Sequence, residues 1–220
     1  EARARGQSVL MGLPLLQNHS LVTDAHAVLP TELEGQIVKL KIGHDLDFER
    51  EWIKSFCAKP GLLRLDVNSS LTGPEFLQWI SGFSDYECKK IDYIEDPCPF
   101  DLSVWQEALE KVQLAADREV AHESLRSSLV LISKPTAIET GVDPLDYKRV
   151  VFTHKMDHPL GARIAHFVAS TFYHLHPEKK EICGLDPQNI FKATGFEGFE
   201  QGSGFGFDAV LPKLKWTTVV

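Results

Sequence analysis

Residues 37–41 read Ile-Val-Lys-Leu-Lys, and residues 62–66 read Leu-Leu-Arg-Leu-Asp. Each is a short apolar run that ends on a charged side chain, Lys41 or Asp66, and three later runs end in the same way at Glu95, Asp117 and Lys134. The gaps between these five residues are 25, 29, 22 and 17 residues, the length of one strand, one helix and their loops. If the strands are parallel neighbours, all five side chains emerge at one edge of one sheet.

The rest of the chain repeats this pattern of strand and helix. Eight segments are candidate strands, most of them continuous apolar runs of the kind that helices cover: Ser20–Asp24, Ile37–Ile42, Leu62–Val67, Tyr93–Glu95, Leu114–Asp117, Leu129–Lys134, Arg149–Thr153 and Glu181–Gly184. Amphipathic segments lie between them: Phe48–Ala58, Pro74–Phe83, Leu102–Val112, Pro144–Tyr147 and Leu160–His174. Eight such units predict an α/β fold, a TIM-like (β/α)7β barrel. A doubly wound sheet is disfavoured because no glycine-rich loop follows the first strand.

Composition argues against several classes of partner and site. The 220 residues are 43% hydrophobic and 25% charged, as in an ordinary globular protein. The net charge of −8 argues against nucleic acid as a partner, and no apolar stretch approaches the roughly 18 residues of a membrane span. The four cysteines show no CxxC pair and are irregularly spaced. This usage disfavours a zinc site and favours a reducing compartment, so we expect a cytoplasmic protein.

Asp66, Glu95 and Asp117 are the candidate metal ligands. A few hard oxygen donors, with room left for water and substrate, suit Mg²⁺, with Mn²⁺ as an alternative. Each residue taken alone could instead cap a helix or face solvent at the start of a loop. Because all three end successive apolar strands, and polar residues at the carboxyl ends of barrel strands are typically catalytic, we predict a divalent-metal site.

Two lysines of one strand face the same way. Lys39 and Lys41 are two residues apart and share a side of the strand, whereas Val38 and Leu40 belong to the side that packs against helices. Two adjacent amines beside a cation should lower each other's pKa, which makes a lysine a workable general base. A solvent-facing strand is the alternative. Lys134 would be a second acid or base, or a cation that stabilises an enolate.

The loop after the seventh candidate strand contains three possible zinc ligands, His154, Asp157 and His158. We interpret this loop as part of the substrate pocket, with zinc as the alternative.

Taken jointly, these residues resemble the enolase superfamily, and within it the muconate-lactonizing-enzyme subgroup, over nearly the whole chain. The matching motifs are Lys39-Leu40-Lys41, Asp66 with Asn68, Glu95-Asp96-Pro97, Asp117 and Lys134-Pro135. Longer matches, at residues 64–68, 94–98 and 134–136, resemble one family of that subgroup, the o-succinylbenzoate synthases.

The resemblance implies a Mg²⁺-dependent lyase that acts on a small-molecule carboxylate substrate. The expected reaction is dehydration of 2-succinyl-6-hydroxy-2,4-cyclohexadiene-1-carboxylate to o-succinylbenzoate, a step of menaquinone biosynthesis that passes through an enolate. By this resemblance Lys41 removes the proton and returns it to the departing hydroxyl, and Lys134 stabilises the enolate from the opposite face. The expected substrate-binding residues are Lys39, Arg64, Asn68, Thr153 and His154.

The chain departs from the family pattern in two places. The fifth strand of family members carries Asp-Glu, but here Asp117 is followed by Arg118 and then Glu119. Family members also carry an N-terminal capping domain that closes over the barrel mouth. Residues 1–19 are expected to be the tail of a preceding helix and a connection, and residues 20–220 the barrel domain, so we expect the cap to be absent from this chain.

Two other functions stay open. An N-acylamino acid racemase or a dipeptide epimerase needs a base on each face of the substrate, and Lys41 and Lys134 could supply both. Epimerases typically carry Asp-x-Asp after the eighth strand, and residues 183–186, Cys-Gly-Leu-Asp, lack the first Asp. A non-catalytic barrel kept for binding is the second alternative, but it predicts the loss of a metal ligand or a lysine, and none is lost.

Overall fold

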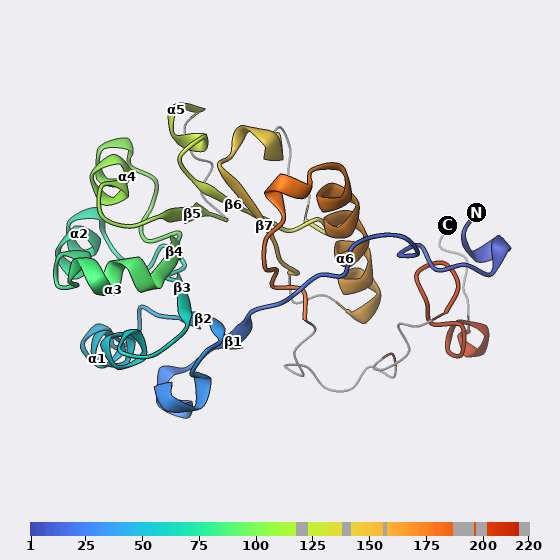
Figure 1. Cartoon of the computed structure of the whole chain (residues 1–220), viewed down its shortest axis with the longest axis horizontal. Helices are drawn as coiled ribbons and strands as arrows, with labels where there is room; N and C mark the ends of the chain where they lie inside the picture. Colours follow the sequence, from blue (N-terminus) through green and yellow to red (C-terminus); the bar gives the residue numbers. More distant parts are fainter. Residues whose placement is uncertain (118–122, 138–141, 156–157, 187–195, 197–201, 216–220) are drawn as a thin grey trace. The chain divides into compact units, whose positions relative to one another are not determined.

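A computed structural model describes residues 1–117, 123–137, 142–155, 158–186, 196 and 202–215 (Figure 1). The chain divides into two compact units, and the position of one relative to the other is not determined. The sheet unit comprises His19–Ser133 and Gly141–Val151, and the terminal unit comprises Glu1–Asn18, Lys134–Thr140 and Phe152–Val220. Each unit is therefore described by itself.

The sheet unit is built on one sheet whose strands lie in chain order from β1 to β7 (Figure 1). Each neighbouring pair from β1 to β6 runs parallel. The strands are β1 (Ser20–Val22), β2 (Ile37–Lys41), β3 (Leu62–Asp66), β4 (Ile91–Glu95), β5 (Leu114–Ala116), β6 (Val130–Ser133) and β7 (Arg149–Phe152). The first seven candidate strands are thereby confirmed as strands, to within two residues at their ends.

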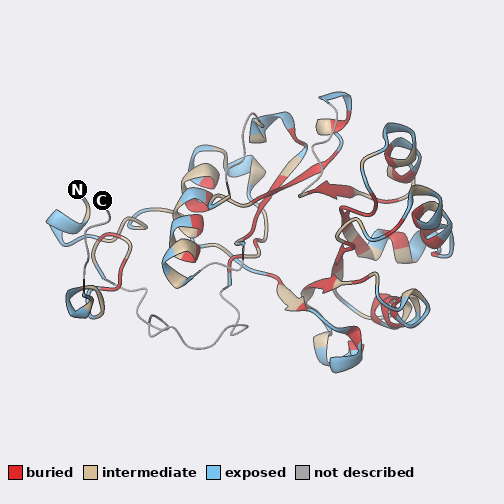
Figure 2. Cartoon of the chain, turned by 180° about the vertical axis from the view of Figure 1, so that it is seen from behind, coloured by how far each residue is buried: buried red, intermediate tan, exposed pale blue. Residues whose placement is uncertain are grey.

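Helices connect these strands and bury their apolar sides. They are α1 (Leu46–Cys57), α2 (Gly73–Ser81), α3 (Asp85–Lys90), α4 (Leu102–Leu109) and α5 (Glu123–Arg126), with 3-10 turns η2 (Ala25–Ala27), η3 (Pro30–Leu33) and η4 (Pro144–Asp146). Thr72 and Ser84 start α2 and α3 with capping boxes, in which the hydroxyl accepts from the third helical N–H while the Glu there reaches back. Figure 2 shows burial concentrated along the strands and on the inward sides of the helices.

Strand register places the charged residues on one face of the sheet. Lys39 lies opposite Arg64, and Lys41 opposite Asp66, which in turn lies opposite Glu95. The register shifts between Leu63 and Arg64, so β4 carries one extra residue there, a β-bulge. An apolar cluster fills the middle of this face across β4 to β7: Tyr93, Ala115, Val130, Ile132 and Val151.

The terminal unit holds the longest helix and one corrected expectation. Its elements are η1 (Arg3–Arg5), α6 (Pro159–Leu175), η5 (Pro177–Lys179) and η6 (Leu211–Lys213). The strand expected at Glu181–Gly184 is reduced to two isolated parallel bridges, from Cys183 to Asn18 and from Gly184 to Thr153. Two apolar residues beside a glycine provide little surface to hold a longer ladder. The described strands thus form one sheet, parallel from β1 to β6, which is part of the expected barrel.

Two further expectations concern the cysteines and the membrane. All four cysteines are buried thiols. No helix within the described ranges has the length and apolar character that a bilayer crossing requires.

Candidate metal and proton-transfer site

The carboxyl ends of β2, β3 and β4 bring four of the predicted site residues together. The Lys39 ammonium lies 3.0 Å from Asp66 Oδ2 and 2.7 Å from Glu95 Oε2. The Lys41 ammonium lies 3.9 Å from the same Asp66 oxygen. Lys41 differs from the others in access, because 27% of its side chain is exposed whereas the Glu95 side chain is 1% exposed. Lys41 is thus the group of this cluster that a substrate can reach.

Lys39 is held as a cation rather than poised as a base. Burial disfavours its ammonium form, but the negative charges of Glu95 and then Asp66 outweigh burial and raise the pKa of Lys39 above its ordinary value. The expectation of a lowered pKa assumed a divalent cation beside the two lysines, and for the metal-bound site it stays a prediction. The position of Lys39 between two carboxylates suits it to hold a substrate carboxylate or to balance charge.

Glu95 shows that this end of the sheet carries surplus negative charge. Burial raises the pKa of Glu95, and the neighbouring carboxylates Asp66 and Asp117 raise it further, against the opposing effect of Lys39. Ionising Glu95 beside these two carboxylates is therefore unfavourable unless more positive charge arrives. A divalent cation would supply that charge.

The residues fit such a cation in kind and in placement. Carboxylate oxygens are the donors that Mg²⁺ prefers, and the three lie on or directly after β3, β4 and β5, which are adjacent in the sheet. Within the described part of the chain, no three acidic, His or Cys side chains already converge closely enough to hold an ion. Glu95 and Asp66 contact Lys39 through one oxygen each, Oε2 and Oδ2.

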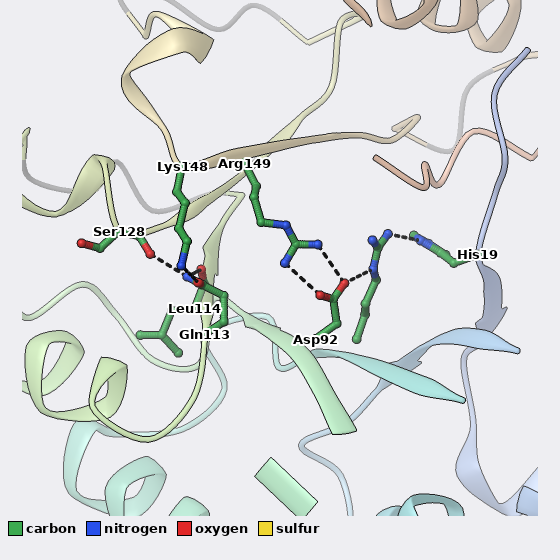
Figure 3. Close-up of polar contacts among 8 residues, drawn as sticks. His19, Asp92, Gln113, Leu114, Ser128, Lys148 and Arg149 are labelled. Atoms are coloured by element: carbon green, nitrogen blue, oxygen red, sulfur yellow. Dashed lines mark hydrogen bonds and ion pairs between the residues drawn. The ribbon is translucent and has the colours of Figure 1, made fainter. Parts of the chain in front are cut away.

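Arg64, an expected substrate-binding residue, belongs to a buried network with Asp92 and His19, in which Arg149 also binds Asp92 (Figure 3). Its Nε donates to Asp92 Oδ2 at 2.8 Å, its Nη1 lies 3.0 Å from His19 Nδ1, and its side chain is 1% exposed. Arg149 donates to both Asp92 oxygens, at 2.8 and 3.2 Å. The bulge in β4 places Asp92 between the two guanidinium groups. This geometry favours a structural role, and a substrate contact of Arg64 stays a prediction.

The other predicted residues are spread over both units. Asn68 follows β3 with a positive φ of 53°, as does Ser69 with 57°. Lys134, Thr153 and His154 belong to the terminal unit, so the structure does not test their distance from Lys41. Among the described residues the buried Thr153 hydroxyl has no hydrogen-bond partner, and His154 Nε2 lies 3.1 Å from the Asp186 carbonyl oxygen.

The zinc alternative and the Asp117 departure both involve residues that lie outside the described ranges. Asp157 is one of these, and so are Arg118 and Glu119, so neither point is tested. His158 caps α6, where its Nδ1 accepts from the Leu160 N–H at 3.3 Å.

Two acidic residues beside the site were missed as positioning groups. Glu49 of α1 is buried, and its carboxylate accepts from the N–H groups of residues 43, 44 and 45, which fixes the loop directly after β2. Asp96 is also buried, and its Oδ1 accepts from the Asp117 N–H at 3.0 Å. The Glu95-Asp96-Pro97 motif marked the position of Asp96, but no sequence pattern revealed this contact.

Comparison with known proteins places these motifs in context. No protein-family model matches the chain. A curated o-succinylbenzoate synthase from Bdellovibrio bacteriovorus is 25% identical over 241 residues, covering 97% of this chain and 72% of the relative. The resemblance to the o-succinylbenzoate synthases is thus confirmed.

Solved structures show the same fold at lower identity. The o-succinylbenzoate synthase of Thermosynechococcus elongatus BP-1, with Mg in its active site, has a TM-score of 0.56 and 20% identity over 82% of this chain. The dipeptide epimerase of Cytophaga hutchinsonii, complexed with Mg and D-Ala-L-Val, has a TM-score of 0.62 and 15% identity over 87% of this chain. The chain spans 63% and 59% of the length of these two proteins. At such identities the likeness shows the fold and does not distinguish between the two reactions.

Proposed function

We propose that this chain is the barrel portion of a Mg²⁺-dependent o-succinylbenzoate synthase, which dehydrates 2-succinyl-6-hydroxy-2,4-cyclohexadiene-1-carboxylate in menaquinone biosynthesis. The observation that carries the proposal is the cluster at the carboxyl ends of β2 to β4, where Lys39 lies within 3.0 Å of Asp66 and Glu95 and Lys41 lies 3.9 Å from Asp66. The curated relative agrees with this choice of reaction.

The proposed roles follow from charge and access. Mg²⁺, or Mn²⁺ in its place, held by Asp66, Glu95 and Asp117, would supply a Lewis acid at the substrate carboxylate and so make the neighbouring C–H more acidic. Lys41, the exposed amine of the cluster, takes that proton and returns it to the departing hydroxyl.

The remaining groups bind and balance charge. Lys39, held charged by its neighbours, orients the substrate carboxylate. Lys134 completes the set as a cation on the other face of the substrate, and Arg64, Asn68, Thr153 and His154 remain candidate pocket residues. Residues 20–220 would close into a (β/α)7β barrel, with residues 1–19 as the connection that precedes it. A cytoplasmic location is consistent with the four buried thiols.

The same cluster could serve a racemase or an epimerase of acylated amino acids or dipeptides. The fold likeness to a dipeptide epimerase that binds Mg and a dipeptide favours keeping this second candidate. Both reactions begin with removal of a proton next to a carboxylate, so substrate choice is what separates them.

An absorbance assay tests the proposal. The protein is mixed with the cyclohexadiene carboxylate and Mg²⁺, and the loss of the diene and the gain of aromatic product are followed. We expect turnover that EDTA abolishes and that Lys134→Ala abolishes without loss of folding. Turnover of N-acyl amino acids or dipeptides, with none of the diene, would replace the synthase by the second candidate. Absence of Mg²⁺ binding would refute both.

A further inference from the structure

Asp96, the residue directly after Glu95 at the end of β4, has an unusual backbone. Its φ is +40°, and the residue is 1% exposed. Positive φ is uncommon outside glycine, and a residue before proline, here Pro97, normally takes an extended conformation. Such conformations persist where surrounding contacts hold them, and they cluster at functional sites. The contacts of Asp96 therefore indicate what its conformation accomplishes.

Three hydrogen bonds hold Asp96 between its neighbouring strands. Its N–H donates to the Ala115 carbonyl of β5 at 3.0 Å, and its own carbonyl accepts from the Ser69 N–H, in the loop after β3, at 2.7 Å. Its side-chain Oδ1 accepts from the Asp117 N–H at 3.0 Å. One residue thus joins the ends of the three strands that present Asp66, Glu95 and Asp117.

The bond to Asp117 replaces one that a regular ladder would make. In a parallel pair, a residue whose N–H donates to the next strand accepts, through its carbonyl, the N–H two residues further along that strand. By this rule the Asp117 N–H would donate to the Asp96 carbonyl. The left-handed turn directs that carbonyl toward Ser69 instead, and the Asp96 carboxylate takes its place.

We propose that Asp96 is a positioning residue that fixes the Asp117 backbone, and with it the Asp117 carboxylate, for binding of the metal ion. This inference rests on the proposed function, since it assumes that Asp117 is a ligand. Groups that hold a metal ligand in place through hydrogen bonds typically change metal affinity by about 10- to 100-fold when they are removed. Asp96 holds this position by hydrogen bonding to the ligand's backbone.

A matched pair of variants separates the side chain from the backbone. Glycine accepts a positive φ readily and asparagine about as well as aspartate, so Asp96→Gly and Asp96→Asn add no backbone strain to the turn. Asparagine keeps a carbonyl oxygen that can accept from the Asp117 N–H, and glycine has none. Calorimetric titration with Mg²⁺ and the electron paramagnetic resonance spectrum of bound Mn²⁺ report affinity and coordination without any substrate.

We expect Asp96→Gly to weaken Mg²⁺ binding by about 10-fold or more and to change the Mn²⁺ spectrum, and Asp96→Asn to stay within about threefold of the native affinity. Native affinity in Asp96→Gly would overturn the inference. Equal losses in both variants would also overturn it, because charge rather than the hydrogen bond would then matter.

Two further results separate this inference from the proposed function. A native protein that binds neither ion would refute both, whereas the expected affinities without turnover of the diene would refute only the synthase. If Asp96→Gly does not fold, the inference is tested instead by the rate of amide hydrogen exchange at Asp117 in the native protein. Slow exchange at Asp117 is expected, and exchange at the rate of an unprotected amide would overturn the inference.

Discussion

The two ends of one sheet face bury charged side chains in different proportions. At the amino ends of the strands, two guanidinium groups, those of Arg64 and Arg149, enclose the single carboxylate of Asp92 (Figure 3). At the carboxyl ends, the ammonium groups of Lys39 and Lys41 contact the carboxylates of Asp66 and Glu95. The charge of a third carboxylate, that of Asp117, also acts on Glu95.

The amino-end network has all its charges paired, whereas the carboxyl-end network can accept another positive charge. The amino-end carboxylate is saturated by forked donors, which suits a contact that holds strands together. The carboxyl end has more negative than positive groups and includes an accessible lysine, so it has both capacity for another cation and a group that can reach a substrate. The position of polar residues along a barrel strand distinguishes stability from catalysis in the same way.

The sharpest test of the comparison is loss of the accessible lysine. Lys41→Ala should lower kcat by about 10³-fold, because a positioned acid or base typically contributes 10²- to 10⁴-fold, while Mg²⁺ affinity changes little. Steady-state kinetics and calorimetry measure the two effects. Lys54→Ala, which removes a half-buried lysine of α1, is the control and should leave both unchanged. Near-native turnover in Lys41→Ala would remove this residue from the mechanism.

The amino end should respond through stability. Arg64→Ala leaves Asp92 with one guanidinium partner fewer in a buried setting, and breaking a buried ion pair costs about 3–5 kcal/mol. Urea unfolding measures this loss, and Mg²⁺ affinity should stay at the native value. A stability change below about 1 kcal/mol combined with a raised KM would instead return Arg64 to the substrate pocket, as the sequence predicted.

Acid should weaken the amino end in a defined direction. Burial opposes ionisation of Asp92, but hydrogen bonds from Arg149 and the charge of Arg64 outweigh it and lower the pKa of Asp92. A lowered pKa in the folded state gives stability that is present above the unfolded value, about 3.9 for Asp, and lost as pH falls through the folded value. The difference in unfolding free energy between native protein and Asp92→Asn should therefore shrink below about pH 4. A difference that stays constant down to pH 2 would contradict this account.

We expect the smallest effect from a helix cap that takes part in neither network of ion pairs. The Thr72 hydroxyl accepts from the Glu75 N–H at the start of α2. Thr72→Ala should cost about 1 kcal/mol in urea unfolding, with metal affinity and turnover unchanged. A fall in Mg²⁺ affinity would show that this cap also helps to position the end of β3.

Sequence patterns predicted the strands well, for a physical reason. A strand covered by helices is apolar along its length, so β5, with Leu114-Ala115-Ala116, and β6, with Val130-Leu131-Ile132, stand out as continuous runs. Helix α3 was not predicted from the sequence, because Cys88 is its only buried residue and the helix therefore has no apolar stripe. Its capping box, Ser84 with Glu87, was the signal that could have revealed it.

The site could be predicted as a set of residues but not as a geometry. Spacing placed Asp66 and Glu95 at one edge of the sheet, because side-chain direction follows strand period. No local pattern encodes the β-bulge that turns Asp92 toward Arg64, or the contact from Asp96 to the Asp117 N–H. Such contacts join residues 21 or more positions apart, and they depend on backbone turns that tertiary packing selects.

The buried cysteines can report local unfolding of the protein. Burial raises the pKa of the Cys57 thiol to about 12, so almost none of it is thiolate at neutral pH. A thiol reagent can therefore react with Cys57 only when α1 separates from the sheet. The labelling rate of each cysteine would report how often its segment opens to solvent. Cys57 and Cys88 would report on the sheet unit, and Cys183 on the terminal unit.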